Sequence, residues 1–575
     1  MLNPLAKYNV QPGPLFLLML FLWFLLNVVQ SLFMEIGNDE AYYWVYAQFL
    51  DWGYYDHPPM VALVIKMGTL LAGDTTLGVR FCVMLMQLLF LIILFRLSRV
   101  THTRPNIILF FLVAFSVVMI QAYGFIATPD APLLLFTVLF LWSYHYFLET
   151  AYSLKGALLM AFCMAGLMYS KYHGALVIVL VLLSNLKLLR KPTLYLSVLL
   201  AVGLYIPHIL WQLNNDFPSI KYHLVERSKG FRWNYFPDFL VNQLPVFNPF
   251  TLGAGIYVFF RRKETDPFER ALKFLFAGFL IFFTLWNFKG RVEPHWTIAA
   301  AVPMIILIVR EAAGNPKLRN YLYKVVAPSI VLLLAARLVL MVDILPVRTE
   351  WHGDKQRVAD LEAIAGNRPV IFTSGFQMPS KYRFYTGREA HAMGALNYRN
   401  TQYDIWRFDE NYLGKPVVID FRNDSTGVVP TRRGNSVFCL KEIAAYQPYK
   451  LLKVVPVLPE RTFIIGREQV VTVTVSNPYP ETYVINHSAM PLEVSLVFMV
   501  KRNEGFTREK ISTRSSFNRQ EIASGEHVTG EISFFLPDMP PGEYSVYFAA
   551  GSPGIYPATI ERPVKIFFKD DSITR

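Results

Sequence analysis

Cysteine is scarce in this sequence, with three residues in 575. Cys82 and Cys163 lie inside apolar segments, and Cys439 stands alone in the more polar C-terminal part. A disulfide framework needs several pairable cysteines in one extracellular domain, so the sequence excludes one. Three isolated thiols also give no reason to expect cysteine-based catalysis.

Charged residues are few, at 17%, whereas 54% of the residues are hydrophobic and 15% are aromatic. Soluble domains average about 25% charged residues, so this balance indicates a membrane protein. The formal net charge of +13 would suit a nucleic-acid partner. The Lys and Arg residues nevertheless cluster in short loops between apolar runs, where the positive-inside rule accounts for them, and no nucleic acid is expected.

Apolar runs recur up to about residue 343, and the remainder has the composition of a water-soluble protein. Runs of roughly 17–22 apolar residues are long enough to cross a bilayer as helices. No small-residue cleavage pattern follows the first run, so we expect it to remain as an anchor. About eleven spans are predicted: 14–34, 77–97, 105–123, 132–149, 156–170, 173–189, 193–211, 246–260, 270–287, 296–310 and 324–343.

Basic residues mark alternate loops between these spans. Loops rich in Lys and Arg face the cytoplasm, and the N-terminus belongs with them. We therefore expect a multi-pass protein of the cytoplasmic (inner) membrane, with its C-terminal domains on the extracytoplasmic, periplasmic side. The opposite, outer loops hold most of the His and Asp residues of the membrane half: 38–76, 127–131, 170–173, 212–245 and 288–296.

Two short helices are predicted inside the first outer loop. Residues 41–50 (AYYWVYAQFL) are rich in aromatic side chains, which is typical of a helix that lies at the level of the lipid headgroups. Pro58-Pro59 then starts a second helix, because the missing N–H of proline is not needed in a first turn.

The C-terminal part contains two further predicted domains. PVIFT (369–373) and PVVID (416–420) read as buried strands, with a helix over 379–385 between them, which indicates a small α/β domain. From about residue 470 the sequence alternates polar and apolar residues, as in VVTVTV, and predicts a β-sandwich of roughly seven or eight strands. The expected domains are 1–345 (helical, in the membrane), 346–465 (α/β) and 466–575 (β-sandwich).

Two acidic groups in the outer loops are candidate catalytic residues. Asn38-Asp39-Glu40 closely follows the first span, where an acceptor from water and a lipid-anchored donor can meet, and this position favours catalytic carboxylates. The alternative is that Asp39 caps a helix, which stabilises by about 1 kcal/mol. Asp130, in the short TPDAP loop (128–132), is the second candidate, and it also has the alternative of a helix cap.

The segment WGYYDHPPM (52–60) places an acid and an imidazole in one turn. His57 can bind phosphate when it is protonated, and Asp56 with His57 can share a divalent metal, for which His223 is the best third ligand. Two adjacent ligands do not define a metal site, so the metal is a hypothesis and no other cofactor is expected.

Lys, Arg and His side chains of the outer loops are candidates for binding a lipid-linked phosphate group. Fixed positive charge and hydrogen-bond donors stabilise the negative charge that develops when such a phosphate leaves. Lys171 is the most informative candidate, because it interrupts apolar sequence on the face where positive charge is disfavoured. Its alternative is a snorkelling lysine at a helix end. The remaining candidates could equally bind anionic lipid headgroups: Arg227, Lys229, Lys289, Arg291 and His295.

The Asp39-Glu40 pair, the aromatic helix, the YYDHPPM turn and the TPDAP loop together resemble the superfamily of protein O-mannosyltransferases and aminoarabinose (ArnT-like) transferases. These are GT-C fold enzymes of glycosyltransferase families 39 and 83. The resemblance covers about residues 10–345 and is strongest at 38–62 and 128–136. It implies a polyprenyl-phosphate sugar donor, inversion at the anomeric carbon, and Asp39 as the base or organiser for the acceptor, with Asp130 at the second acidic position.

The sequence departs from these families at two points. Asp56-His57 is similar to an acidic-basic pair beside the donor phosphate of aminoarabinose transferases, but there the basic partner is usually Lys, so constant positive charge at His57 is in doubt. The His-x-His element of eukaryotic protein mannosyltransferases is absent. Protein mannosylation is therefore not implied.

The predicted function is that of a polyprenyl-phosphate-sugar-dependent glycosyltransferase that modifies an envelope acceptor, namely lipid A of lipopolysaccharide, another glycan or a protein. Catalysis is assigned to Asp39, Glu40 and Asp130, and donor phosphate binding to His57, Lys171, Arg227, Lys289, Arg291 and His295. The alternatives are a transporter or flippase of a lipid-linked glycan and a non-catalytic envelope assembly subunit. Ion-coupled carriers usually place charges near the bilayer midplane, where these spans have almost none.

Overall fold

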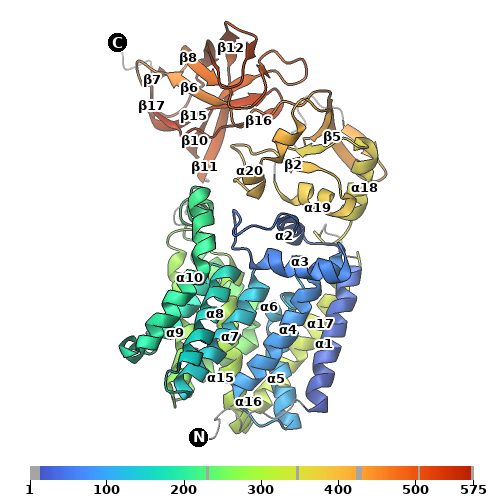
Figure 1. The fold of residues 1–575 in the computed structure, drawn as a ribbon, viewed down its shortest axis with the longest axis vertical. Helices are drawn as coiled ribbons and strands as arrows, with labels where there is room; N and C mark the ends of the chain where they lie inside the picture. Colours follow the sequence, from blue (N-terminus) through green and yellow to red (C-terminus); the bar gives the residue numbers. More distant parts are fainter. Residues whose placement is uncertain are drawn as a thin grey trace. The chain divides into compact units, whose positions relative to one another are not determined.

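The computed structural model describes residues 13–227, 232–344, 349–373, 375–421, 430–502 and 505–570. The chain divides into two compact units, Met1–Asp354 and Lys355–Arg575. Figure 1 shows that the first unit is helical and that the second combines helices with β-sheets. This division confirms the predicted fold class of a helical membrane part followed by a β-rich part.

Six helical stretches among the described residues are long and apolar enough to cross a membrane. They comprise α1 (Pro14–Phe33), α4 (Thr76–Ser98), α7 (Asp130–Glu149), α10 (Pro192–Asn214), η4 with α15 (Pro294–Gly314), and α16 with η5 and α17 (Pro316–Leu340). Other helices of this unit are α5 (Arg104–Ser116), α8 (Leu154–Ser170), α9 (Gly174–Leu183), α12 (Tyr235–Phe247), α13 (Pro249–Arg261) and the 20-residue α14 (Pro267–Trp286). The count of about eleven spans stays a prediction.

The predicted span 105–123 is wrong as one continuous helix. α5 ends at Ser116, and a separate short helix, α6, covers Val118–Ala122. Ser116 Oγ donates to the Val113 carbonyl at 2.7 Å, and Gln121 Nε2 donates to the Phe115 carbonyl at 2.5 Å. These side chains donate hydrogen bonds to backbone carbonyl groups near the end of α5. Because these carbonyls are then paired, the backbone can leave the helix within an apolar environment.

The first outer loop forms α2 (Asn38–Gln48) and α3 (Met60–Ala72), which lie across one end of the helical bundle (Figure 1). α3 begins directly after Pro59, as predicted. The aromatic helix, which is predicted to lie at the level of the lipid headgroups, has residues 41–47 all buried within the protein. Tyr46 stacks on Tyr54 with ring centroids 4.0 Å apart. Exposed apolar side chains of this region lie on α3, as in Leu70 and Leu71, and in the segment between the two helices, as in Trp52.

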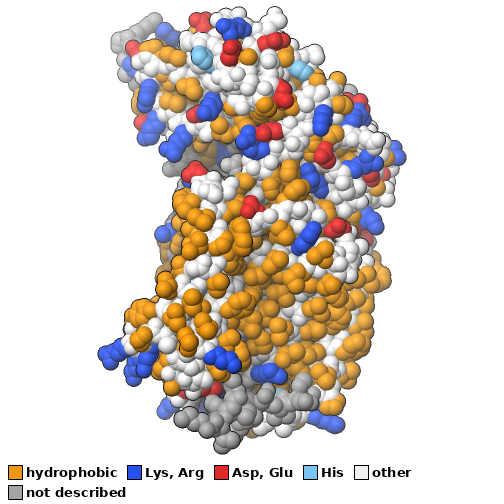
Figure 2. Space-filling view, viewed as in Figure 1, with side chains coloured by type: hydrophobic (Ala, Val, Ile, Leu, Met, Phe, Trp, Pro, Cys, Tyr) orange, Lys and Arg blue, Asp and Glu red, His pale blue; other side chains and the backbone are white. Residues whose placement is uncertain are grey.

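Hydrophobic side chains cover much of the visible surface of the helical unit (Figure 2). α10 and α17 contribute many of its exposed large apolar residues, among them Leu199, Leu210, Leu332 and Leu338. Apolar surface of this extent is unfavourable in water. A lipid environment accounts for it, and the protein is an integral membrane protein.

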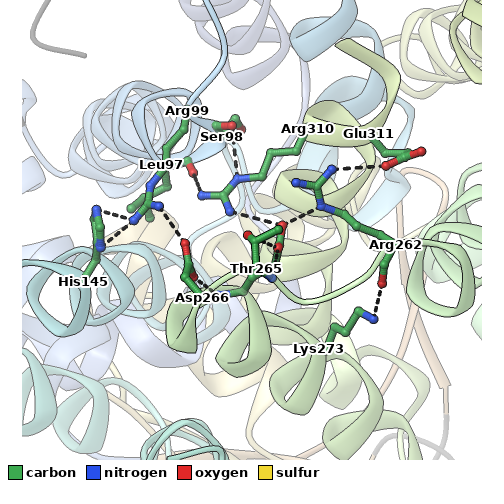
Figure 3. A network of polar contacts seen from close by, with 11 residues as sticks. Leu97, Ser98, Arg99, His145, Arg262, Thr265, Asp266, Lys273, Arg310 and Glu311 are labelled. Atoms are coloured by element: carbon green, nitrogen blue, oxygen red, sulfur yellow. Dashed lines mark hydrogen bonds and ion pairs between the residues drawn. The ribbon is translucent and has the colours of Figure 1, made fainter. Parts of the chain in front are cut away.

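A polar network joins α4, α7, α14 and α15 with the loop after α13 (Figure 3). The buried Glu269 accepts hydrogen bonds from Arg262 Nε at 2.5 Å and from the Thr265 hydroxyl at 2.7 Å, and it lies 3.7 Å from Arg310 Nη1. Arg310 also donates to the Leu97 and Ser98 carbonyls. Three of the basic loops therefore meet at one end of the bundle, which agrees with their predicted common side.

The second unit begins with a five-stranded sheet in the order β2-β1-β3-β5-β4. β1 (Val370–Phe372) pairs in parallel with β2 (Ala390–Ala392) and β3 (Val417–Asp420), whereas β5 (Ser436–Ile443) runs antiparallel to β3 and to β4 (Pro430–Arg433). The helices α18 (Asp354–Ala365) and α19 (Gln377–Thr386) contribute to its hydrophobic core. β1, α19 and β3 coincide with the two strands and the helix predicted there.

The rest of this unit is a β-sandwich with a four-stranded sheet, β12-β14-β8-β6, and a six-stranded sheet, β11-β10-β15-β17-β7 with β16 on β15. Phe463 contacts Phe534 across the sheets, with ring centroids 5.4 Å apart. The β-rich part begins earlier than the predicted residue 466, because β6 (453–457) pairs with β8. The other strands of the two sheets are β7 (Thr462–Ile464), β8 (Glu468–Ser476), β10 (Glu493–Arg502), β11 (Gly505–Ser512), β12 (Arg514–Phe517), β14 (His527–Phe535), β15 (Gly542–Ser552), β16 (Ile555–Ala558) and β17 (Val564–Lys569). β9 (Tyr483–Val484) and β13 (Glu521–Ile522) form a separate two-stranded sheet.

Replacing Glu269 by Gln leaves Arg262 and Arg310 opposite a neutral amide. Removing one partner of a buried ion pair costs about 3–5 kcal/mol, and because Arg262 is 22% exposed we expect the lower end of that range. The free energy of unfolding in detergent measures this effect. Glu264→Gln, an exposed carboxylate in the same loop, should change it by less than about 0.5 kcal/mol; equal effects of the two variants would contradict the role of the network.

Candidate active site

A buried ion pair anchors the first outer loop. The Glu40 carboxylate accepts four hydrogen bonds: from Arg80 Nε at 2.8 Å, Arg80 Nη2 at 2.6 Å, the Gly37 N–H at 2.9 Å and the Ala127 N–H at 2.9 Å. Arg80 also donates to two backbone carbonyls just after α1. The Glu40 carboxylate thus connects the start of α2 with α4 and with the loop before α7. Through Arg80, the same contacts reach the segment that follows α1.

These contacts favour a positioning role for Glu40 over the catalytic role predicted from the sequence. Burial acts to raise the pKa of Glu40, but the charge and hydrogen bonds of Arg80, with the two backbone N–H groups, outweigh it, and the pKa is lowered. A carboxylate that is ionised and fully hydrogen-bonded is a poor proton acceptor. Arg80 could have been identified from the sequence, because a charged residue inside a predicted membrane span indicates a functional residue.

Asp39, the neighbouring residue, is exposed at the start of α2. The cap of this helix is Gly37, so the alternative of Asp39 as an N-cap is not observed. Burial, with the negative charges of Asp39, Asp56 and Asp130, raises the pKa of Tyr43 far above its usual value. Carboxylates from the predicted outer loops therefore approach one tyrosine.

Asp130 forms a buried ion pair with Lys171. Lys171 Nζ lies 2.8 Å from both carboxylate oxygens of Asp130, and each side chain is about 5% exposed or less. Asp130 is the first residue of α7, where the helix dipole favours negative charge. Lys171 points into the protein, so the alternative of a snorkelling lysine does not describe it.

Histidines gather around this pair. His223 Nε2 lies 3.0 Å from the Asp56 carbonyl oxygen, and the His57 and His223 rings are 6.3 Å apart. Burial lowers the pKa of His223 to about 4, so this residue is neutral at pH 7. His173, which sequence reasoning did not single out, interacts electrostatically with Lys171 and with His57, His223 and His295.

The cationic candidates separate into two sets. Arg227 Nη2 donates to Glu293 Oε1 at 2.7 Å, and its guanidinium lies 4.7 Å from the Trp296 ring. His295 interacts electrostatically with Lys171, Asp130 and Arg227, so it joins the same cluster. Lys289 and Arg291 are exposed, and Lys289 lies over the Trp286 ring instead. Lys229 is outside the described residues.

The residues of the metal hypothesis do not form a ligand set. Asp56 meets His223 through its backbone carbonyl, and its carboxylate accepts from the Tyr46 hydroxyl at 3.3 Å. Across the described ranges, no group of three or more His, Cys, Asp or Glu side chains has an arrangement suited to a metal ion. The divalent metal stays a prediction, and no chemical step is assigned to it.

Glu40→Gln should lower the free energy of unfolding by about 3–5 kcal/mol, because Arg80 then loses its buried counter-charge. Since the pKa of Glu40 is lowered in the folded state, its contribution is present above its ordinary pKa of 4.5 and is lost as the pH falls through the folded value. Thermal unfolding at several pH values measures both effects. The exposed neighbour Asp39→Asn is the control, and a Glu40→Gln protein of normal stability would contradict the positioning role.

Three comparisons show which known proteins this chain is similar to. The family model of dolichyl-phosphate-mannose-protein mannosyltransferases matches residues 56–211. The lipid A galacturonosyltransferase RgtD of Rhizobium johnstonii is 26% identical over 283 residues, which are 47% of this chain and 59% of that protein. The chain thus spans less than two thirds of that relative.

Two crystal structures of ArnT from Cupriavidus metallidurans are similar to this chain. The apo form has a TM-score of 0.53 at 15% identity, over 75% of this chain and 98% of that one. The form bound to undecaprenyl phosphate has a TM-score of 0.51 at 14% identity, over 75% and 99%. The resemblance indicated by the sequence motifs is confirmed, and the chain has the fold of the GT-C glycosyltransferases of the ArnT-like type.

Proposed function

We propose that this protein is an inverting glycosyltransferase that moves a sugar from a polyprenyl phosphate to an envelope acceptor on the outer face of the cytoplasmic membrane. The observation that carries the proposal is that an exposed carboxylate, Asp39, and a buried, oriented cation, Lys171, belong to one cluster. The similarity to ArnT, one structure of which holds undecaprenyl phosphate, supports this choice of donor.

Lys171 and Arg227 are suited to hold the donor phosphate. An ammonium has three N–H donors, and Asp130 accepts from Lys171 through both of its oxygens, so one donor remains for a phosphate oxygen. Glu293 and Trp296 hold Arg227 on two sides. Charges fixed in this way stabilise the negative charge that develops on the leaving phosphate without further reorganisation.

Asp39 is suited to activate the acceptor. Phosphate is a good leaving group and needs no general acid, so one carboxylate that removes the hydroxyl proton is sufficient. Attack on the face opposite the departing phosphate inverts the anomeric carbon. The similarity to a lipid A galacturonosyltransferase makes lipid A the first acceptor to test, before other glycans and proteins.

Asp39→Asn should lower kcat by about 10²–10⁴-fold, which is the usual contribution of general base catalysis, without a change in thermal stability. The assay is mass spectrometry of lipid A after incubation with reconstituted protein and a polyprenyl-linked sugar extract. Asp238→Asn, an exposed carboxylate at the start of α12, is the matched control. A transporter or an assembly subunit would show no transfer in any variant, and transfer at the wild-type rate by Asp39→Asn would refute the role of Asp39.

A further inference from the structure

The segment that connects the two units folds back on the turn that begins α2. The connecting segment, residues 349–354, follows α17 (Ala327–Leu340) and ends where the second unit starts, at Lys355. The turn, residues 35–38, lies between α1 and Asp39. Both segments belong to the first unit, and only the folded chain brings them together.

Glu35 makes three hydrogen bonds to the connecting segment. Its carboxylate accepts from the N–H groups of Gly353 and Asp354, one through each oxygen and each at 3.0 Å. Its own N–H donates to the Trp351 carbonyl at 3.0 Å. Hydrogen bonds to a charged group are stronger than those between neutral groups. One side chain of the turn therefore fixes the backbone of the connecting segment, and the backbone of the turn is fixed in return.

Glu350 completes the start of α2. The cap residue of this helix is Gly37, which has no side chain that could accept from the first N–H groups of the helix. The Asn38 N–H donates instead to Glu350 Oε2 at 2.8 Å, although the two residues are 312 positions apart. A carboxylate at a helix N-terminus also interacts favourably with the helix dipole. The connecting segment thus supplies a cap that the local sequence lacks.

Trp351 adds apolar packing to these hydrogen bonds. Its side chain packs against a hydrophobic cluster that includes the buried Phe125. A Cβ atom at Gly37 would lie 3.5 Å from Trp351 Nε1, so the indole lies directly against the turn. Phe125 belongs to the loop that leads to Asp130 at the start of α7. The connecting segment therefore shares one hydrophobic cluster with the second acidic loop.

α17 holds the beginning of the connecting segment in place. Arg337 Nε donates to Gln30 Oε1 at 2.5 Å and Arg337 Nη2 donates to Asn27 Oδ1 at 2.6 Å, which joins α17 to α1. His352 Nε2 lies 2.9 Å from the Leu340 carbonyl oxygen at the end of α17. The connecting segment is thus attached both to a membrane helix and to the turn, which restricts how far the turn can move.

We propose that Glu35 and Glu350 are positioning residues, which fix the start of α2 and thereby the place of the Asp39 carboxylate. Asp39 follows the turn directly, and its side chain is exposed, so its place depends on the direction in which α2 begins. A displacement of about 1 Å can lower the rate of a catalysed reaction by 10²-fold. The effect on catalysis rests on the proposed function, in which Asp39 activates the acceptor.

Variants of the two carboxylates test the proposal in the full chain in nanodiscs. Glu35→Gln keeps the shape of the side chain but replaces one acceptor oxygen by an NH₂ group, which cannot accept from a backbone N–H. Glu350→Leu removes the acceptor for Asn38, whereas Glu350→Gln keeps an oxygen that can accept and should resemble the wild-type protein more closely. Asp343→Asn, an exposed carboxylate of the same connecting region, is the control.

Hydrogen exchange of the peptide that covers residues 36–40 should become roughly tenfold faster in Glu35→Gln and in Glu350→Leu, because each variant loses a hydrogen bond to a charged group. Exchange in α8 should stay at the wild-type rate. In the transfer assay, kcat should fall roughly 10–100-fold in both variants. The KM for the donor should not change, because Lys171 and Asp130 keep their contacts.

Wild-type exchange at 36–40 in both variants would overturn the proposal, whether or not the protein transfers sugar. Exchange that is faster by the same factor throughout the first unit would overturn it too, because it indicates a general loss of stability. In an active protein, an unchanged kcat or a rise in donor KM alone would contradict it as well. A wild-type protein without transfer would refute the proposed function instead, and faster exchange confined to 36–40 would then still support the role of the two carboxylates in fixing this turn.

Discussion

The arrangement of the first unit depends on the buried contact between Glu40 and Arg80. Buried ion pairs contribute little net stability compared with apolar packing, because both charges lose their hydration. Their value here is in specificity: the Glu40 carboxylate accepts four hydrogen bonds, and only one placement of α2, α4 and the 127–130 loop satisfies them together. The exposure of Asp39 and the burial of Asp130 follow from that placement.

Charges are also paired around the phosphate site that we propose. Lys171 and Arg227 are bound to Asp130 and Glu293, so neither cation stands alone in a region of low dielectric constant. A paired cation keeps its direction and still has N–H groups to donate. Donors that are preorganised in this way supply much of the rate enhancement in many enzymes that stabilise a departing anion.

Local signals made part of this structure predictable from the sequence. The Pro-Pro step predicted the start of α3, and the acidic loops predicted the carboxylates that gather around Tyr43. Long-range contacts were not visible, because nothing local links Glu40 with Ala127 or Asn38 with Glu350. Arg80 lies inside a predicted apolar run, and the burial of the α2 aromatic residues was not predicted, because composition does not distinguish a lipid-facing surface from a protein interior.

We propose that the cluster around Asp130 and Lys171 binds a polyprenyl phosphate, and native mass spectrometry of the purified protein tests this binding most directly. The double variant Asp130→Asn/Lys171→Met leaves no buried charge unpaired, so stability should be kept. We predict one polyprenyl phosphate bound to the wild-type protein and to Asp39→Asn, and none bound to the stable double variant. Retention of the lipid by the double variant would contradict the claim.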